Sequence, residues 1–342
     1  CSFATLFASK LSSLTWLSVE PATELIFLRF CNNFFLPHAL YASIKLDLWA
    51  NKISAEFTDE FVCLTDKSSI FGKPIVFINY FRLFHERNSF LYFSPGSIEA
   101  SEFFFDGISG SRENTSLLLF SHLSKNSKYI LDIGAFHGLF TFLAAVSNSN
   151  SIIKAFEPVK ANAKIFKSLV KKNKNTNVQI FEFALSDYDG TTYINNEVEH
   201  PSGLSLENSN QDINSEKIFV VNTKNFFRQK IQHPIDLVKI DVERHECVVV
   251  KEMLDSIDVS RTTMIIEVLN KENLIKIMMM LKLKNYLVFG INEKSTSLLP
   301  IDDSFSGFEY TLSGKFFHTA SEVKIYNFLF LPIEKQHQIE TF

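Results

Sequence analysis

Short apolar runs alternate with amphipathic stretches through the second half of the chain. A strand inside a parallel sheet is covered on both faces, so a continuous apolar run bounded by turn residues is typical of such a strand. The runs of this kind are Tyr129–Ile133, Ile152–Phe156, Ile235–Val242, Thr263–Val268, Tyr286–Asn292 and Ile325–Pro332. Helical spacing is found at Leu139–Ser147, Val159–Lys174 and His245–Ile257. This order predicts an α/β fold with a doubly wound, mostly parallel sheet and helices on both faces.

Two further runs, Val178–Leu185 and Thr191–Asn195, flank the tetrapeptide Asp-Tyr-Asp-Gly. Because Asp-Gly between two strand-like runs favours a tight turn, this spacing predicts a hairpin-like pair. A long polar insertion follows it. Within the insertion, the segment His200–Ser205 is a candidate for a mobile lid over the substrate.

The first 125 residues differ from the rest, since their apolar spacing is irregular and their turn signals are weak. Helices are expected at Pro21–Phe30 and Glu113–Ser124, and strands at Phe61–Leu64 and Pro74–Asn79. A polar break at Ser124–Lys128 ends this region. We therefore divide the chain into an α+β extension, residues 1–125, and a sheet domain, residues 126–342. The extension is expected to cap the sheet edge or to form a dimer contact.

Composition and charge argue against several classes of protein. The chain has 342 residues, is 46% hydrophobic and carries a formal net charge of -4. It is too apolar for a disordered chain, and its acidic balance gives no general attraction to nucleic acid or anionic lipid. No apolar run reaches the roughly 20 residues of a membrane-spanning helix. The cysteines are far apart without a Cys-x-x-Cys pair, so a reducing cytoplasm is the expected location.

The first clear strand ends in a loop that contains two glycines. Its sequence is Asp132-Ile133-Gly134-Ala135-Phe136-His137-Gly138, and a predicted helix follows at once. Gly134 permits a sharp turn out of the strand, and Gly138 permits the helix start to pack closely against that strand. The free N–H groups of a helix start favour an anionic group such as a carboxylate or phosphate. His137 is also a candidate contact, although a single histidine is more often solvated or satisfied within the protein.

The next strand ends in Phe156-Glu157-Pro158, which places an acid at its carboxyl end. An acid in this position can accept hydrogen bonds from both hydroxyl groups of a ribose. The alternative is an ordinary acid at a helix start, where it stabilises the helix dipole. A dinucleotide loop requires Gly-x-Gly-x-x-Gly, and the loop at Gly134 does not supply it. The order Asp-x-Gly-x-x-x-Gly followed by Glu-Pro instead resembles class I methyltransferases that use S-adenosylmethionine.

The resemblance narrows at later blocks of the chain. The segment Lys239-Ile240-Asp241-Val242-Glu243-Arg244-His245-Glu246 resembles the Lys-Ile-Asp-Val-Glu-Gly-x-Glu motif of the FkbM methyltransferase family. Leu131–Ala135 with Gly138 and Thr141 is similar to the family's first motif, and Ala184–Asp187 with Gly190 to its third-strand turn. The resemblance covers residues 131–267. It implies a Rossmann-like class I methyltransferase that uses S-adenosylmethionine to methylate hydroxyl groups of sugars, glycolipids or secondary metabolites.

The resemblance also implies roles for individual residues. Asp132 would bind the amino group of the cofactor, Glu157 its ribose, and the pair Ala184-Leu185 its adenine. The full set expected at the cofactor is Asp132, Gly134, Ala135, Gly138, Glu157, Ala184, Leu185 and Asp241. Asp241 is the first candidate to accept the acceptor's hydroxyl proton, with Glu243 and His245 behind it. Glu267 ends the fifth strand and is a further candidate near the acceptor, with burial against a lysine as the alternative.

Two positions depart from the family's pattern. Phe136 replaces the usual Asn in the cofactor loop, and Arg244 replaces a Gly. These changes keep open a second hypothesis, a catalytically silent relative that binds a nucleoside. A third hypothesis is a nucleic-acid methyltransferase, and the charge balance argues against it. Glu246 is better interpreted as an acid in the first turn of a helix. A divalent cation at Asp241 stays open as an alternative, but no metal ion is predicted, because Asp241 has no second carboxylate at fixed spacing.

Overall fold

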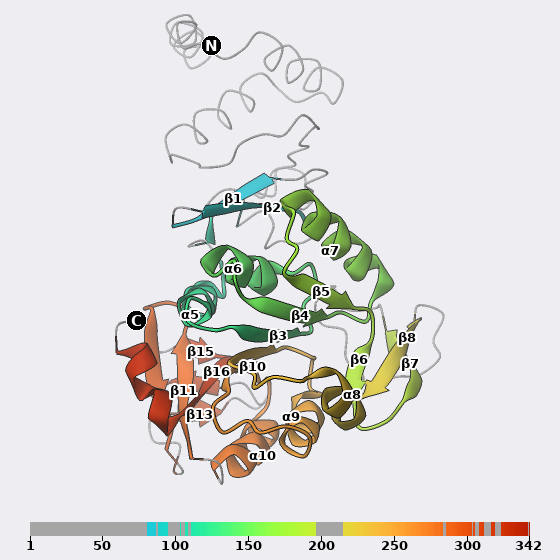
Figure 1. Cartoon of the computed structure of the whole chain (residues 1–342). Coiled ribbons are helices and arrows are strands. Elements are labelled where there is room, and N and C mark those ends of the chain that lie inside the picture. The colour runs from blue at the N-terminus through green and yellow to red at the C-terminus, as the bar shows by residue number, and fades with distance from the viewer. Residues whose placement is uncertain are drawn as a thin grey trace, which may run out of the picture. The chain divides into compact units, whose positions relative to one another are not determined.

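The structure is a computed structural model (Figure 1). It describes residues 81–86, 88–94, 103, 107–108, 111–195, 215–282, 285–302, 304, 308–310, 316–318, 323–340 and 342. The elements predicted at Pro21–Phe30, Phe61–Leu64 and Pro74–Asn79 lie outside the described residues, and so does the lid candidate His200–Ser205.

A central sheet of eight strands organises the domain, in the order β12-β11-β16-β10-β9-β3-β4-β5. Neighbouring strands from β10 to β5 are parallel, whereas β16 runs antiparallel to both β10 and β11. The strands are β3 (Tyr129–Ile133), β4 (Ile152–Phe156), β5 (Val178–Phe181), β9 (Leu237–Ile240), β10 (Thr263–Glu267), β11 (Tyr286–Asn292), β12 (Ser297–Pro300) and β16 (Asn327–Pro332). The predicted mostly parallel sheet is therefore confirmed.

The order of the strands reverses between β3 and β9. From β3 the chain proceeds outward to β4 and β5, and then returns to place β9 on the other side of β3. In open α/β sheets, ligands bind outside the carboxyl ends of the strands at such a switch point. The residues that follow β3, β4 and β9 are consequently the ones to examine.

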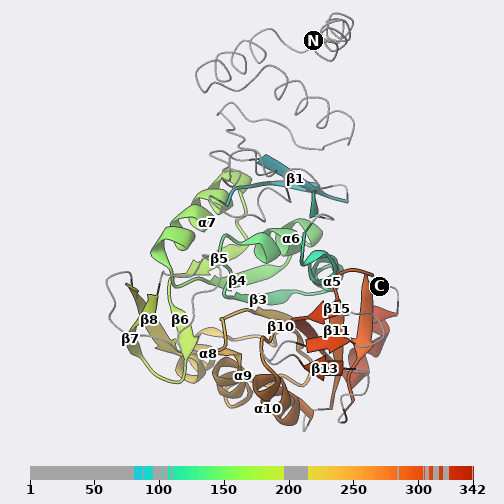
Figure 2. The ribbon, with the colours of Figure 1, turned by 180° about the vertical axis from the view of Figure 1, so that it is seen from behind.

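Helices cover both faces of the sheet, as two opposite views show (Figure 1, Figure 2). One face carries α5 (Asn114–Ser124), α6 (Leu139–Ser147) and α7 (Lys160–Asn173), and the other carries α8 (Thr223–Lys230), α9 (Glu246–Leu254) and α10 (Lys271–Lys282). On α7, Ala163 and Phe166 are buried while Lys160, Lys164 and Lys167 are exposed, as an amphipathic helix requires. A short 3-10 helix, η3 (Ile333–Ile339), ends the described chain.

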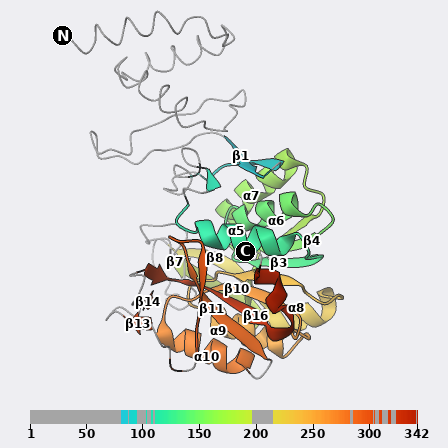
Figure 3. The ribbon, with the colours of Figure 1, turned by 90° about the vertical axis from the view of Figure 1, so that its left-hand side faces the viewer.

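A two-stranded hairpin, β1 (Phe81–His85) and β2 (Asn88–Tyr92), lies over α6 and α7 (Figure 3). The Asn173 side chain of α7 accepts from the backbone N–H of Leu91 at 2.7 Å and donates to its carbonyl at 2.8 Å. Phe90 stacks on Phe142 of α6, with ring centroids 5.6 Å apart. This part of the predicted extension is thus packed on the helical layer. Its role as a cap or dimer contact stays a prediction.

The hairpin predicted around Asp-Tyr-Asp-Gly is wrong. β6 (Ala184–Ser186) and β7 (Gly190–Asn195) do not pair with each other, because β8 (Ser215–Asn222) lies between them, parallel to β6 and antiparallel to β7. The predicted strand Val178–Leu185 is also split into β5 and β6, which belong to different sheets. A separate three-stranded sheet contains β13 (Phe308–Tyr310), β14 (Phe316–His318) and β15 (Val323–Ile325).

Aromatic rings fill the contact between the edge of the central sheet and α8. Phe156 of β4 stacks on Phe181 of β5 at 5.0 Å, and Phe226 of α8 meets both rings edge-on. Phe183, between β5 and β6, joins the same group. Edge-to-face packing of this kind stabilises a core beyond the area that it buries. The group of phenylalanine rings lies where the chain leaves the sheet after β5, directly beside the carboxyl end of β4.

No helix in the described part of the chain has the length and apolar character needed to cross a membrane.

Candidate functional site

Gly134 brings the ends of β3 and β9 into close approach. Its φ is +85°, and a Cβ added at this position would lie 1.7 Å from the carbonyl oxygen of Asp241. The Asp241 N–H donates to the carbonyl of Ile133 at 2.9 Å. A side chain larger than hydrogen cannot occupy this position, and glycine also tolerates the left-handed backbone. Gly134 therefore places Asp241 beside the loop that the sequence assigned to the cofactor.

Gly138 is required for a different contact from the one predicted. It caps α6 with a φ of +83°, and a Cβ there would lie 2.1 Å from the ring of Phe166 on α7. Hence Gly138 permits α6 to approach α7, where we expected packing against the strand. Gly138 is buried, and it is not among the residues that line the cleft described below.

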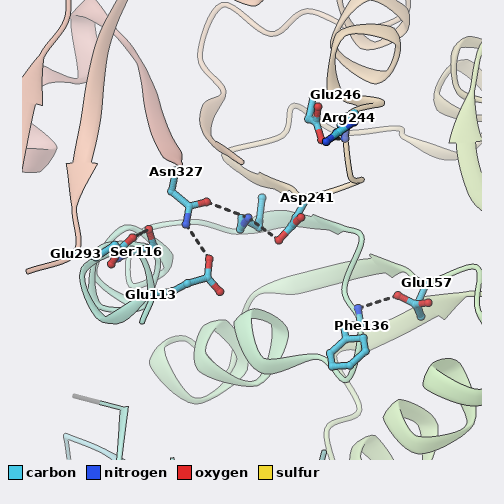
Figure 4. A network of polar contacts seen from close by, with 10 residues as sticks. Glu113, Ser116, Phe136, Glu157, Asp241, Arg244, Glu246, Glu293 and Asn327 are labelled. Atoms are coloured by element: carbon cyan, nitrogen blue, oxygen red, sulfur yellow. Dashed lines mark hydrogen bonds and ion pairs between the residues drawn. The ribbon is translucent and has the colours of Figure 1, made fainter. Parts of the chain in front are cut away.

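Glu157 connects the end of β4 to the glycine loop. Its carboxylate accepts the backbone N–H of Phe136 at 2.8 Å, the N–H of Val159 at 2.9 Å and the Asn162 side chain at 3.4 Å (Figure 4). Only 4% of Glu157 is exposed, and burial raises its pKa to about 7 in spite of these donors. Glu157 therefore makes the helix-start contact of the alternative interpretation, and it also lies at the end of β4 where the ribose site was predicted.

A cleft opens at the ends of β3, β4 and β9. Its wall includes Gly134, Glu157, Asp241 and Glu243 from the ends of the parallel strands. The other lining residues are Ile133, Phe136, Phe156, Pro158, Val159, Asn162, Phe183, Ala184, Leu185, Ile194 and Val242. The wall thus combines apolar surface with a few convergent polar groups, as is typical of small-molecule sites.

Three of the predicted cofactor residues lie behind this wall. Asp132 is 1% exposed and accepts from the hydroxyl of Thr141 at 2.6 Å, and burial raises its pKa to about 6. Ala135 and Gly138 are likewise buried and do not line the cleft. The structure therefore brings five of the eight predicted residues together: Gly134, Glu157, Ala184, Leu185 and Asp241. Whether each contacts a cofactor stays a prediction.

A buried group of charges lies beside Asp241, on the side of the sheet that carries α5 and α6. The Nζ of Lys239 lies 3.3 Å from Oδ2 of Asp241 and 3.3 Å from Oδ1 of Asn327. The Nδ2 of Asn327 donates to Glu113 at 2.7 Å, as Figure 4 shows. Carboxylate oxygens of Glu113, Asp241 and Glu267 all lie within 4.8 Å of one another. Among the residues that the structure describes, these three acids are close enough to share a cation, and the Lys239 ammonium already lies beside them.

The charges perturb one another strongly. Burial lowers the pKa of Lys239, but the carboxylates of Asp241, Glu113 and Glu267 outweigh it and hold this pKa above its ordinary value. Burial, together with Asp241, raises the pKa of Glu267 well above its ordinary value. Sequence reasoning missed Lys239, Glu113 and Asn327. A lysine inside the apolar run Leu237–Ile240 was the available signal, since a buried ammonium requires partners.

The loop after β9 has an unusual backbone. Glu243 and Arg244 both have left-handed conformations, with φ of +50° and +77°. Glu243 lines the cleft, and burial, then Asp241, raises its pKa to about 8. The buried Glu246 accepts the backbone N–H of Arg244 at 2.8 Å, which supports its interpretation as a helix-start acid (Figure 4). Phe136 has a third such conformation, with a φ of +50°.

Each of the two histidines considered from the sequence hydrogen-bonds a serine hydroxyl. His245, a catalytic candidate, places Nε2 2.9 Å from the hydroxyl of Ser186 on β6. His137 is 2% exposed, with Nδ1 2.7 Å from the hydroxyl of Ser94. Burial lowers the pKa of His137 to about 4. Neither residue lines the cleft, so the candidates that meet there are Asp241 and Glu243.

The sheet order, with its single switch point and one reversed strand inside the sheet, defines a Rossmann-like class I methyltransferase fold. Residues 132–288 match the family model of the methyltransferase FkbM domain. This match confirms, over residues 132–288, the resemblance to the FkbM family that the motifs show.

Solved structures with weak similarity were also found. The FkbM methyltransferase of Methylobacillus flagellatus KT is 12% identical with a TM-score of 0.37, over 60% of this chain and 43% of that one. The precorrin-6y C5,15-methyltransferase of Geobacter metallireducens GS-15 is 12% identical, with a TM-score of 0.35 over 64% and 88% of the two chains. The O-methyltransferase TomG of Streptomyces achromogenes is 11% identical, with a TM-score of 0.36 over 65% and 79%. No curated protein matches the chain in sequence.

Proposed function

We propose that this protein transfers a methyl group from S-adenosylmethionine to a hydroxyl group of a small-molecule or carbohydrate acceptor. The FkbM domain supports methyl transfer as the class of reaction. The observation that carries the assignment to this site is that Gly134, Glu157 and Asp241 share one cleft at the switch point of the sheet. The hydroxyl acceptor rests on the family resemblance.

The residues of the cleft suit the parts of this cofactor. Glu157 has a buried carboxylate at the end of β4, where an acid accepts hydrogen bonds from the hydroxyl groups of a ribose. Ala184 and Leu185 supply apolar surface for an adenine. The carboxylate of Asp241, at the end of β9, attracts a positively charged group that is bound in the cleft. S-adenosylmethionine, when bound, supplies an activated methyl group on a sulfonium.

The protein then has two tasks. It must hold the acceptor oxygen in line with the methyl carbon, and alignment of this kind is worth about 7–11 kcal/mol. It must also accept the hydroxyl proton, which typically contributes about 10²–10⁴-fold. Asp241 is the candidate base because its carboxylate lines the cleft at the end of β9. Glu243, with its pKa raised to about 8, holds its own proton at neutral pH and is suited to donating a hydrogen bond.

Calorimetry with S-adenosylmethionine and S-adenosylhomocysteine tests the cofactor assignment. We expect the native protein to bind both, and Glu157→Gln to bind them at least about 10-fold more weakly, since hydrogen bonds to charged groups are worth about 1.5–3 kcal/mol. Glu293→Gln is the matched control. Glu293 also accepts backbone N–H groups at a helix start, from Thr115 at 2.8 Å and Ser116 at 3.2 Å, but does not line the cleft. A native protein that binds neither compound at millimolar concentration contradicts the proposal.

Turnover separates the proposed enzyme from a catalytically silent relative. The second hypothesis is favoured by one observation, the ring of Phe136 in the wall of the cleft. We expect release of S-adenosylhomocysteine with at least one member of a panel of sugars, glycolipids and small alcohols, identified by mass spectrometry of the methylated product. Asp241→Asn should slow this transfer by about 10²–10⁴-fold. Cofactor binding without transfer to any hydroxyl would favour the silent relative.

A further inference from the structure

Lys239 is a fully buried cation next to the cleft. It lies on β9, two residues before Asp241, so the two side chains leave the strand on the same face. Only 1% of Lys239 is exposed, and its ammonium lies 5.1 Å from the ring centroid of Phe140. Lys239 itself does not line the cleft, whereas Asp241 does. It is therefore placed to act on the site only through its neighbours.

Two neighbours fix the position of this ammonium. It lies 3.3 Å from Oδ2 of Asp241 and 3.3 Å from Oδ1 of Asn327. The other amide atom of Asn327, Nδ2, donates to Glu113 at 2.7 Å, so the orientation of the amide is determined at both ends (Figure 4). Glu113 and Asn327 lie outside residues 132–288, which match the FkbM domain. Segments on both sides of that domain thus complete the surroundings of Asp241.

The charges explain why this arrangement matters. An ammonium removed from water is costly unless a carboxylate compensates it. Conversely, Glu113, Asp241 and Glu267 have oxygens within 4.8 Å of one another, and like charges at this distance cannot all stay ionised without a cation. The carboxyl groups of Asp132, Glu243 and Glu246 also interact with the charge of Asp241. Asp241 is the one of the three that contacts the ammonium directly. The negative charge of the group is therefore concentrated on the carboxylate that faces the cleft.

We propose that Lys239 is a positioning residue for methyl transfer, which places a positive charge against Asp241 and holds its Oδ2 so that the carboxylate stays directed at the cleft. Asn327 and Glu113 hold the lysine in place. This inference rests on the proposed function, because Asp241 is the carboxylate that faces the sulfonium and the acceptor. In a protein without Lys239, three carboxylates within 4.8 Å of one another have no cation beside them, so the group holds its full negative charge, which attracts the sulfonium, only at higher pH.

The pH dependence of cofactor affinity tests this role. Calorimetry between about pH 5.5 and 9 measures the affinities for two compounds. S-adenosylmethionine carries the sulfonium charge, and S-adenosylhomocysteine lacks it. In Lys239→Met, the pH at which the affinity for S-adenosylmethionine is half of its maximum should rise by about 1–3 pH units, the effect of losing an opposite charge at this distance. The affinity for S-adenosylhomocysteine should change less than about 3-fold, because a neutral sulfur is insensitive to that charge.

Matched variants separate this role from a merely structural one. Lys239→Arg keeps the charge and should restore the native pH midpoint. Lys154→Met removes a lysine from β4 of the same sheet and should leave the midpoint unchanged. The ammonium of Lys154 donates to the backbone carbonyl of Lys230 at 2.7 Å. Lys239→Gln is a second neutral variant for use if Lys239→Met does not fold, and a thermal melt at each pH establishes folding.

The outcomes are distinct. A native midpoint in a folded Lys239→Met or Lys239→Gln variant that still binds S-adenosylmethionine overturns the inference and leaves the proposed function intact. Absence of binding to the native protein instead contradicts the proposed function itself. A raised midpoint in the neutral variants, with the native value in Lys239→Arg and Lys154→Met, supports the role of Lys239.

Discussion

Arg244 adopts a backbone conformation that disfavours every residue with a Cβ. Its φ of +77° follows the left-handed Glu243, at the position where the FkbM motif has glycine. A left-handed conformation costs an L-residue roughly 1–2 kcal/mol. Glycine removes this cost but loses about 0.5–1 kcal/mol through its larger unfolded-state entropy. Arg244→Gly should therefore increase the free energy of unfolding by about 0.5–1 kcal/mol.

The contacts of Arg244 favour this result. The side chain is exposed, while two hydrogen bonds use the backbone: the N–H donates to Glu246 at 2.8 Å and the carbonyl accepts from Asn273 at 3.3 Å. Glycine keeps both bonds. An increase of this size in a domain of this length corresponds to a rise in melting temperature of about 1–4 °C.

Urea unfolding followed by circular dichroism measures the change, with Arg228→Gly as the control. Arg228 is an exposed arginine inside α8, where glycine is expected to lower stability by about 1 kcal/mol. The same substitution should thus have opposite signs at the two positions. If Arg244→Gly lowers the urea midpoint as Arg228→Gly does, the left-handed conformation of this loop is not a source of strain.

Two further predictions concern the cleft. Gly134→Ala should destabilise the protein by at least about 3 kcal/mol in urea unfolding, because the added Cβ would lie 1.7 Å from the Asp241 carbonyl oxygen. Gly107→Ala is the control: Gly107 has a φ of +65° and no atom within 4 Å of an added Cβ, so the substitution should cost only about 1–2 kcal/mol. Equal losses at the two positions would refute the close approach. Burial raises the pKa of Glu243 from 4.5 to about 8, so its contribution favours folding at low pH and is lost as the pH rises through about 8. The glutamine side chain of Glu243→Gln is neutral at every pH, so the stability of this variant relative to the native protein should increase between pH 4.5 and about 8. The melting temperatures of both proteins across this range measure the change, and parallel pH profiles would contradict it.

The parallel half of the fold was predictable because local pattern and burial agree there. β3, α6 and β4 begin and end at the predicted residues, since each strand is a continuous apolar run and Gly134 and Gly138 mark the intervening turn. The pairing of β6 and β7 was not predictable from the Asp-Gly turn. Their common partner β8 comes from a part of the chain beyond a long polar insertion, and tertiary pairing with it replaced the local hairpin.

The site divides in the same way. Gly134, Glu157 and Asp241 follow consecutive or adjacent parallel strands, so their meeting at one end of the sheet follows from topology alone. The surroundings of Asp241 do not, because Glu113 precedes the first sheet strand and Asn327 begins the last. Only the position of β16, inserted between β10 and β11, brings these two side chains together. A pattern limited to short sequence separations carries no information about that contact.

The left-handed residues around the cleft connect these observations. Phe136, Glu243 and Arg244 all have positive φ, and the first two line the cleft at the ends of β3 and β9. The close approach at Gly134 forces both loops to turn sharply at the same place, and non-glycine residues at such turns store strain. The N–H of Phe136 is held by Glu157 and that of Arg244 by Glu246, so buried carboxylates stabilise the strained turns. If this strain maintains the shape of the cleft, Arg244→Gly should stabilise the protein and at the same time weaken its affinity for S-adenosylmethionine, and calorimetry on the same variant measures the second effect.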